Sequence, residues 1–346
     1  TLVAEYGYFS SGESFTIADP DEAWVLEMIG KGTGMHGAVW VAVRIPDDCI
    51  AAHSNCSRIH QFPLDDPNNC MYSADVISFA RSKGYFNGIN KDFSFADAYC
   101  PLTFEKRRFA EARTWQFFNR FTDKGLDYLP YIQGKSDVAM PLYMKPNRKL
   151  SVQDIRTAMR DHYENTPLDL RNDDAAGPFH SPYRLFPLEY TVDGKKYFHE
   201  RSVSEQYNGF VLVAQMRSDK PDAVGGLQWF AVDDANCTVF TPIYCCTDTV
   251  PRCLAHISDE LTFNWDSSFW VFNWLANMVY PYYDLMIGDL RTKQSEMENW
   301  FDHQHDSIEA AACELYKTNA ASAKKMLTKY SLSCAQSTHD EWRKFG

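Results

Sequence analysis

The sequence lacks any apolar stretch long enough to cross a membrane, which would need about 18 consecutive apolar residues. Its most apolar segment, FWVFNWLANMVYPYYDLMI, is interrupted by polar residues and a proline and is predicted to be a core helix. Basic residues are scarce: 34 Lys and Arg stand against 46 Asp and Glu, for a formal net charge of −12. Because phosphate contacts require clustered Lys and Arg, this composition argues against nucleic-acid binding and favours a small substrate or a soluble partner.

The common catalytic and cofactor motifs are absent as well. The sequence contains no GxSxG elbow, no P-loop and no GxGxxG, and its acidic turns lack the spacing of a calcium-binding loop. Its 10 cysteines include no CxxC pair, so spacing predicts neither a zinc site nor a disulfide framework. In FDHQHD (301–306) the two histidines are two residues apart on a predicted helix and point in different directions, which indicates a solvated face. We therefore expect no cofactor and no metal.

Alternating and helical patterns follow one another along the chain. Period-two alternation predicts an antiparallel meander in the first part and three further strands in the second, together with a hairpin around Asp193-Gly194. Helical periodicity predicts helices between these groups, one of them capped by Ser151, and a helical C-terminal part over 266–346. Predicted strands are 15–18, 23–29, 38–45, 49–54, 208–218, 225–234 and 237–246; predicted helices are 74–84, 104–121 and 152–164. This order predicts an α+β layered sandwich with antiparallel sheets.

The densest group of chemically active residues is IPDDCIAAHSNCSRI (45–59). A cysteine there could be a nucleophile only with a base nearby, and His53 is the local candidate for Cys49. The alternative is that Cys49 and Cys56 are inert, buried small hydrophobes, as most cysteines in ordinary folds are. The pattern favours this second interpretation.

Four separated strings resemble the dipeptidase A-like family of cysteine-dependent N-terminal-nucleophile hydrolases. They are GESFTIADPDEAWVLEM, VWVAVRIPDDCIAAHSNCSRI, VAQMRSDKPDAVGGLQWFAVDDANCTVFTPIY and SSFWVFNWLANMVYPYYDLM, in the family's order. The likeness runs from about Tyr6 to about Tyr330, and the family's ANQ-like triplet appears as Ser54-Asn55-Cys56. The resemblance implies a four-layer αββα sandwich, here a single domain over 1–346 that lacks its N-terminal strands.

The resemblance also implies an activity, the cysteine-dependent hydrolysis of small dipeptides through an acyl-enzyme. The family's nucleophile is an N-terminal cysteine that lies well before the region matched here. We therefore expect the nucleophile outside this chain, and the chain alone to be inactive. Thr1 as an N-terminal nucleophile is a disfavoured alternative. Two alternative functions are left open: an amide acylase of the penicillin or bile-salt type, and a catalytically dead binding domain. Assembly into a homo-oligomer is also left open.

Two residues are implied as catalytic. Asn55 matches the asparagine whose side-chain NH2 donates to the developing oxyanion, although an asparagine that only caps a turn is the alternative. Arg113 matches a distal arginine held against the nucleophile, with Arg108 as a substitute and a surface arginine as the default. The pair Gly225-Gly226 permits close backbone approach, which suits sheet packing as well as substrate binding.

Overall fold

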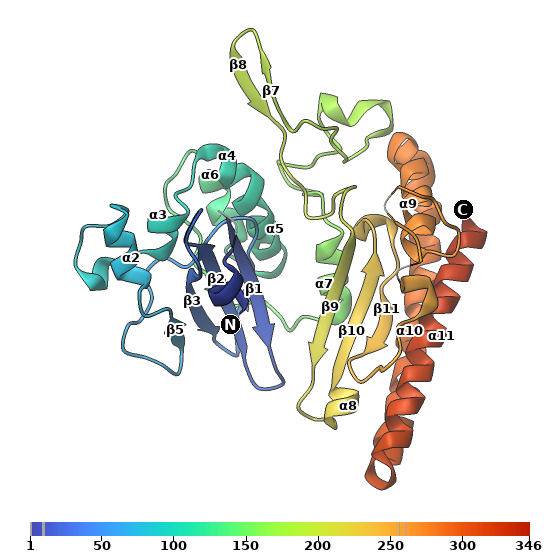
Figure 1. The fold of residues 1–346 in the computed structure, drawn as a ribbon. Helices are drawn as coiled ribbons and strands as arrows, with labels where there is room; N and C mark the ends of the chain where they lie inside the picture. The colour runs from blue at the N-terminus through green and yellow to red at the C-terminus, as the bar shows by residue number, and fades with distance from the viewer. Residues whose placement is uncertain (1, 9–10, 256, 260) are drawn as a thin grey trace. The chain divides into compact units, whose positions relative to one another are not determined.

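The computed structural model describes residues 2–8, 11–255, 257–259 and 261–346 (Figure 1). Thr1, the disfavoured candidate for an N-terminal nucleophile, lies outside the described residues. The chain divides into two compact units: Thr1–Lys149 with Thr191–Arg201, and Leu150–Tyr190 with Ser202–Gly346. Each unit is described by itself below.

The first unit is built on an antiparallel sheet of order β1-β2-β3-β5. Its strands are β1 (Gly12–Ala18), β2 (Ala23–Gly30), β3 (Ala38–Ile45) and β5 (Cys70–Tyr72), beside a short pair β4 (Ile50–Ala51) and β6 (Tyr143–Met144) and the hairpin β7 (Glu189–Val192) and β8 (Lys195–Phe198). Residues of one pleat face, such as Val25, Val39 and Val41, are buried against Val76 and Phe95. The alternation in sequence therefore becomes one buried sheet face, as period two requires.

The first unit also contains short helical segments. They are α1 (Leu2–Tyr6), α2 (Val76–Ser82), η1 (Asn90–Asp92), α3 (Phe95–Tyr99), α4 (Phe104–Lys106), η2 (Arg107–Glu111), α5 (Ala112–Phe121), η3 (Gly125–Tyr128) and α6 (Leu129–Ile132). The helix predicted over 104–121 is present but is interrupted, because η2 is a π-helical turn. Such turns are frequent at functional sites, and this one carries Glu111, which contributes to the site below.

The second unit contains an antiparallel sheet of order β11-β10-β9, formed by β9 (Phe210–Met216), β10 (Gly226–Val232) and β11 (Thr241–Tyr244). Leu227, Trp229 and Ala231 alternate along β10 and are buried. They share one core with Phe272 and Leu275 of the C-terminal helices. Apolar burial of this kind is the main favourable term in folding.

The helical segments of this unit are α7 (Val152–Met159), η4 (Asp174–Phe179), α8 (Asp222–Gly225), η5 (Ala235–Cys237), η6 (Arg252–Leu254), α9 (Ser268–Val279), η7 (Tyr280–Tyr282), α10 (Tyr283–Thr318) and α11 (Ala320–Phe345). Of these, α7, α8, α9, α10 and α11 contact the sheet. Ser151 caps α7 as predicted, in a reciprocal capping box with Asp154. At Gly225 an added Cβ would lie 2.7 Å from the Arg217 carbonyl oxygen, so the glycine serves close backbone packing.

The predicted α+β class is confirmed by this mixture of helices and antiparallel sheets. The strand predicted over 49–54 is an exception, since only β4 forms there and it pairs with β6 instead of extending the meander. Beyond Ala51 the chain leaves the ladder, because the Ala52 carbonyl oxygen accepts from Arg58 Nη1 at 2.9 Å and the His53 ring bonds to Thr16 Oγ1 at 2.9 Å. Within the described ranges, no helix combines the length and apolarity that a membrane crossing requires.

Candidate functional site

The loop that follows β4 is anchored by a buried carboxylate. Glu27 of β2 is 1% exposed and accepts hydrogen bonds from the Ser57 hydroxyl, from the Arg58 backbone N–H at 2.6 Å and from the Ile59 backbone N–H at 3.2 Å. Burial raises the pKa of Glu27, although these donors and the nearby Arg58 charge oppose the shift. The carboxylate thus fixes the backbone immediately after Asn55.

Arg58 connects this loop to the helices of the first unit. Its Nε donates to Glu111 Oε1 at 2.7 Å, in an ion pair whose side chains are 2% and 4% exposed. Its remaining donors reach the carbonyl oxygens of Ala52 at 2.9 Å and Pro141 at 2.9 Å, and its guanidinium lies over the Phe118 ring at 5.6 Å. A buried guanidinium with this many acceptors is satisfied and rigid.

The cysteines of the 45–59 segment are poor nucleophiles in this arrangement. Burial and the Glu111 carboxylate raise the pKa of Cys56 well above its usual value, and its thiol donates to Glu111 Oε1 at 3.5 Å. Burial and Asp48 also raise the pKa of Cys49. His53 is bonded to Thr16 Oγ1 at 2.9 Å, and burial lowers its pKa. Since the thiolate is the reactive form, these thiols are suited to packing and not to attack.

Asn55 and Arg113, the two residues implied as catalytic, lie side by side. Arg113 Nη2 donates to Asn55 Oδ1 at 2.6 Å, and Arg113 Nε donates to the Phe109 carbonyl oxygen at 2.9 Å. A second guanidinium reaches the same amide oxygen, because Arg201 Nη1 lies 3.3 Å from Asn55 Oδ1. With Oδ1 accepting from both arginines, the side-chain NH2 of Asn55 is the group left to donate elsewhere.

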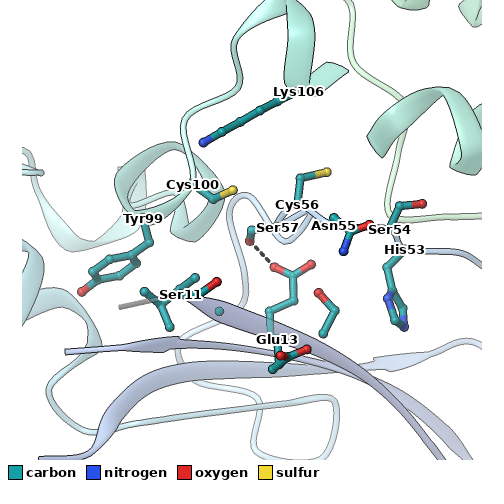
Figure 2. A pocket seen from close by; sticks show the side chains of 14 residues that line it. Ser11, Glu13, His53, Ser54, Asn55, Cys56, Ser57, Tyr99, Cys100 and Lys106 are labelled. Carbon is teal, nitrogen blue, oxygen red and sulfur yellow. Dashed lines mark hydrogen bonds between the residues drawn. The ribbon is translucent and has the colours of Figure 1, made fainter. Parts of the chain in front are cut away.

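Asn55 lines a cavity of about 570 Å³ (Figure 2). Glu27 and residues of β1 line it on the side of the first sheet's strands, and Figure 2 shows Lys106 reaching over the pocket from above. The lining residues are Ser11, Gly12, Glu13, Ser14, Glu27, Ile29, His53, Ser54, Asn55, Cys56, Ser57, Tyr99, Cys100 and Lys106. A volume of this order accommodates a small ligand such as a short peptide.

Sequence reasoning missed several residues of this site. Arg201 is 146 positions from Asn55 along the chain, and no local pattern marks it. Glu27 looked like an ordinary polar position of a strand, although it falls on the pleat face of the buried Val25 and Val41. That anomaly, a carboxylate on a buried face, was the one available signal. Arg108, the proposed substitute for Arg113, pairs with Glu200 instead.

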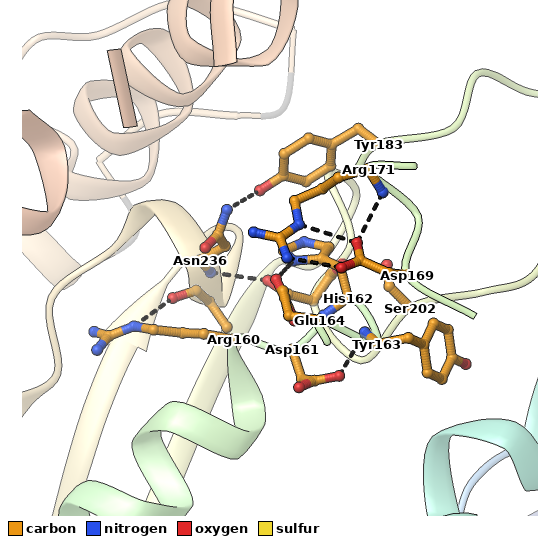
Figure 3. Close-up of polar contacts among 12 residues, drawn as sticks. Arg160, Asp161, His162, Tyr163, Glu164, Asp169, Arg171, Tyr183, Ser202 and Asn236 are labelled. Atoms are coloured by element: carbon orange, nitrogen blue, oxygen red, sulfur yellow. Dashed lines mark hydrogen bonds and ion pairs between the residues drawn. The ribbon is translucent and has the colours of Figure 1, made fainter. Parts of the chain in front are cut away.

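The second unit holds a separate polar cluster (Figure 3). Arg171 Nη2 donates to Asp169 Oδ2 at 2.7 Å, and Asn236 Nδ2 donates to the Tyr183 hydroxyl oxygen at 2.7 Å. Burial raises the pKa of Tyr183. These contacts pair the polar groups of the long connection after α7 with each other and with the core, so they stabilise the connection as a structural element.

The FDHQHD segment on α10 is largely solvated, as predicted, because Asp302, His303 and Asp306 are exposed, whereas His305 is partly buried. Asp302 receives Arg156 Nη2 at 3.1 Å, and Arg156 is fully buried. His305 lies 3.2 Å from Glu309 and packs on the Trp229 ring at 5.5 Å between centroids. The physical reason is that part of this face meets β10 and its polar neighbours. No group of three or more potential metal-ligating side chains occurs among the residues the structure describes.

Comparisons with known proteins agree on one family. A family model described as Peptidase family C69 matches residues 1–296. A "Probable dipeptidase" of Latilactobacillus sakei is 26% identical over 283 residues, covering 82% of this chain and 52% of that protein. "Dipeptidase A" of Lactobacillus helveticus is 27% identical over 271 residues, covering 78% and 50% respectively. "Probable dipeptidase B" of Lactococcus lactis is 26% identical over 330 residues, covering 92% and 62%. The chain thus spans about half to three fifths of the length of these relatives.

Proposed function

Because this chain belongs to peptidase family C69, we propose that it is the catalytic-site-bearing portion of a cysteine-type dipeptidase. Relatives of this chain carry the names dipeptidase and dipeptidase A. The single observation that carries the proposal is the Asn55 amide, which faces a pocket of peptide size while two guanidiniums hold its oxygen. The substrate we propose is a small dipeptide.

Asn55 would act as a donor to the oxyanion. When a thiolate attacks the peptide carbonyl carbon, the carbonyl oxygen becomes negative and gains most from a hydrogen-bond donor that is already in place. The Asn55 NH2 group supplies that donor, and Arg113 and Arg201 add positive charge close to it. The tetrahedral intermediate then expels the amine, and water hydrolyses the acyl-enzyme.

We propose that the nucleophilic cysteine is supplied by a segment outside these 346 residues. The raised pKa of Cys56 and the hydrogen bond of its thiol to Glu111 support this, since neither favours the thiolate. Cys100 also lines the pocket, so it is the competing nucleophile within the chain.

Lys106 offers a partner for a substrate with a free carboxylate. The two acidic residues of the lining are already engaged, since Glu27 accepts from the donors described above and Glu13 accepts from the Tyr8 hydroxyl. Among the described residues that line the pocket, Lys106 is the permanent cation, because burial lowers the pKa of His53 and keeps that ring neutral at neutral pH. In a chain of net charge −12 an anionic group needs such a local cation. A dipeptide carries a terminal carboxylate, so Lys106 suits it.

We further propose that both units belong to a single four-layer αββα sandwich domain. Each unit supplies an antiparallel sheet with helices packed on one face. Each sheet also bears exposed apolar side chains, with Ile17 50% exposed in one and Phe210 61% exposed in the other. Exposed apolar faces of this kind are typical of surfaces that pack against another element.

The proposed activity is tested on the product of the complete reading frame. Hydrolysis of the dipeptides Ala-Leu and Leu-Gly is measured beside that of the acyl amides penicillin V and glycocholate. Turnover of the acyl amides alone would show that the protein is an acylase and not a dipeptidase. Asn55→Ala should lower kcat by about 100- to 1000-fold, whereas the exposed Asn87→Ala serves as the matched control. Equal dipeptide turnover in the two variants would remove the oxyanion role of Asn55.

A further inference from the structure

We infer that the hairpin arm, defined as Thr191–Arg201, is a positioning element of the proposed catalytic site, and that Arg201 is its acting residue. This inference rests on the proposed function, because it treats Asn55 as the oxyanion donor. The arm lies between two stretches of the second unit in sequence but groups with the first unit by its contacts. It therefore brings a residue to Asn55 from a distant part of the chain.

The arm has a defined local structure of its own. Strands β7 and β8 are joined by Asp193 and Gly194, whose φ angles are 49° and 75°. Two successive positive φ values are typical of the tight hairpin turn whose twist matches that of its strands. The arm is thus a short ribbon with a determined direction, and its C-terminal end carries Arg201.

Aromatic and ionic contacts hold the arm against the α4–η2 segment (Phe104–Glu111). The Phe198 ring lies 5.9 Å from the Phe104 ring and 5.4 Å from the Phe109 ring, measured between centroids. Glu200 pairs with Arg108. Aromatic pairs at such separations are attractive, and Phe198 takes part in both of them, so it is the main attachment point.

The two arginines converge on one oxygen from different elements. Arg113 comes from α5 and Arg201 from the arm, and both donate to Asn55 Oδ1, at 2.6 Å and 3.3 Å. The Phe109 carbonyl, which holds Arg113 Nε at 2.9 Å, belongs to a residue that Phe198 contacts. The arm therefore acts on the Asn55 amide directly through Arg201 and also supports the residue that holds Arg113.

This arrangement has a chemical consequence for the Asn55 amide. A carboxamide can rotate by 180°, which exchanges the positions of its oxygen and its nitrogen. Two guanidinium groups donate to this position, so only the oxygen, which is the acceptor, can occupy it. This preference favours an NH2 group that is preorganised to donate to a developing negative charge.

The kinetic test compares Arg201→Ala, Arg201→Lys and the control Lys195→Ala in the product of the complete reading frame. Lys195 is exposed on the same hairpin. Arg201→Ala should lower kcat by about 10- to 100-fold, the usual effect of losing a partner that orients a functional group, with KM little changed. Arg201→Lys should recover part of the rate, because it restores a donor without the fork, and Lys195→Ala should keep the wild-type kcat.

A double-mutant cycle separates positioning from general stability. If Arg201 acts through Asn55, then Arg201→Ala adds no further loss of kcat in an Asn55→Ala background. A full additional loss of kcat in that background would overturn the inference, and so would an unchanged kcat in Arg201→Ala alone.

A second measurement keeps this inference apart from the dipeptidase activity. In the 346-residue chain, the side-chain NH2 resonances of Asn55 are recorded by 1H–15N NMR and assigned with Asn55→Ala. Arg201→Ala should shift these resonances, and Lys195→Ala should leave them in place. Absence of dipeptide hydrolysis with shifted resonances would refute the proposed function alone, whereas unshifted resonances would refute the role of the arm.

Discussion

Removing one partner of the buried Arg58–Glu111 ion pair should destabilise the first unit strongly. Both side chains are nearly inaccessible, and their Nε and Oε1 atoms are 2.7 Å apart. Loss of one member of such a pair leaves an uncompensated buried charge and costs about 3 to 5 kcal/mol. Glu111→Gln should lose a free energy of unfolding at the low end of this range, because Arg58 keeps its carbonyl acceptors and has Glu27 nearby.

Arg58→Met should lose a free energy of unfolding at the high end of the same range at neutral pH. It removes the Arg58 charge that opposes the effect of burial on Glu27, so the folded-state pKa of Glu27, already raised by burial, rises further above its unfolded value. The folded state then binds more protons than the unfolded state, and the stability of this variant falls as pH rises. Its deficit relative to wild type should therefore be smaller at pH 5 than at pH 8.

The assay is urea unfolding of the 346-residue chain followed by tryptophan fluorescence. Trp115 of α5 is fully buried in the first unit and reports on its unfolding. The double variant with Arg58→Met and Glu111→Leu replaces the pair by apolar groups and should lose much less free energy of unfolding than the sum of the losses in the single variants Arg58→Met and Glu111→Leu. Additive losses within about 0.5 kcal/mol would show that the two residues do not act as a pair and would refute the reasoning.

Three further predictions concern single groups. Burial raises the pKa of Asp233 to about 7, so its ionisation opposes folding above that pH. Asp233→Asn, whose amide can still accept from Asn273, should therefore gain stability relative to wild type as pH rises from 4 to 8. A difference in urea midpoint that does not change with pH would contradict this. Cys56→Ala and Cys100→Ala should both retain dipeptide turnover. If mass spectrometry shows that Cys100→Ala no longer forms the acyl-enzyme, the nucleophile lies in this chain. Lys106→Met should raise KM by about 10-fold for free dipeptides but not for dipeptide amides, and equal changes would exclude carboxylate recognition.

The elements of this fold could largely be predicted because their signals are local. Period-two alternation marked β1, β2 and β3, and Ser151 marked the start of α7 through its capping hydrogen bonds. The turn at Asp193-Gly194 followed from the backbone preferences of those two residues. The failure at 49–54 has a physical reason as well, since Ile50 and Ala51 pair with β6 and the carbonyl oxygen of Ala52 accepts from the buried Arg58 guanidinium instead of a neighbouring strand.

The resemblance also carried part of the site. The motif Ser54-Asn55-Cys56 indicated Asn55, and the structure brings Arg113 to it, although the chemical roles of both residues remain proposals. The cysteines that made this segment conspicuous are engaged or buried, a fact that depends on Glu111 more than 50 residues away. Composition and spacing cannot report such a contact.

The sequence by itself determined the α+β class, the positions of the main strands and helices, and the family. These depend on interactions between neighbours in the chain or on strings long enough to identify relatives. Only the tertiary structure decided that Arg201 meets Asn55, that Glu27 anchors the loop and that Lys106 reaches over the pocket. The reason is that hydrogen bonds and charges act over a few ångströms in space, whereas these partners are separated along the chain by up to 146 positions.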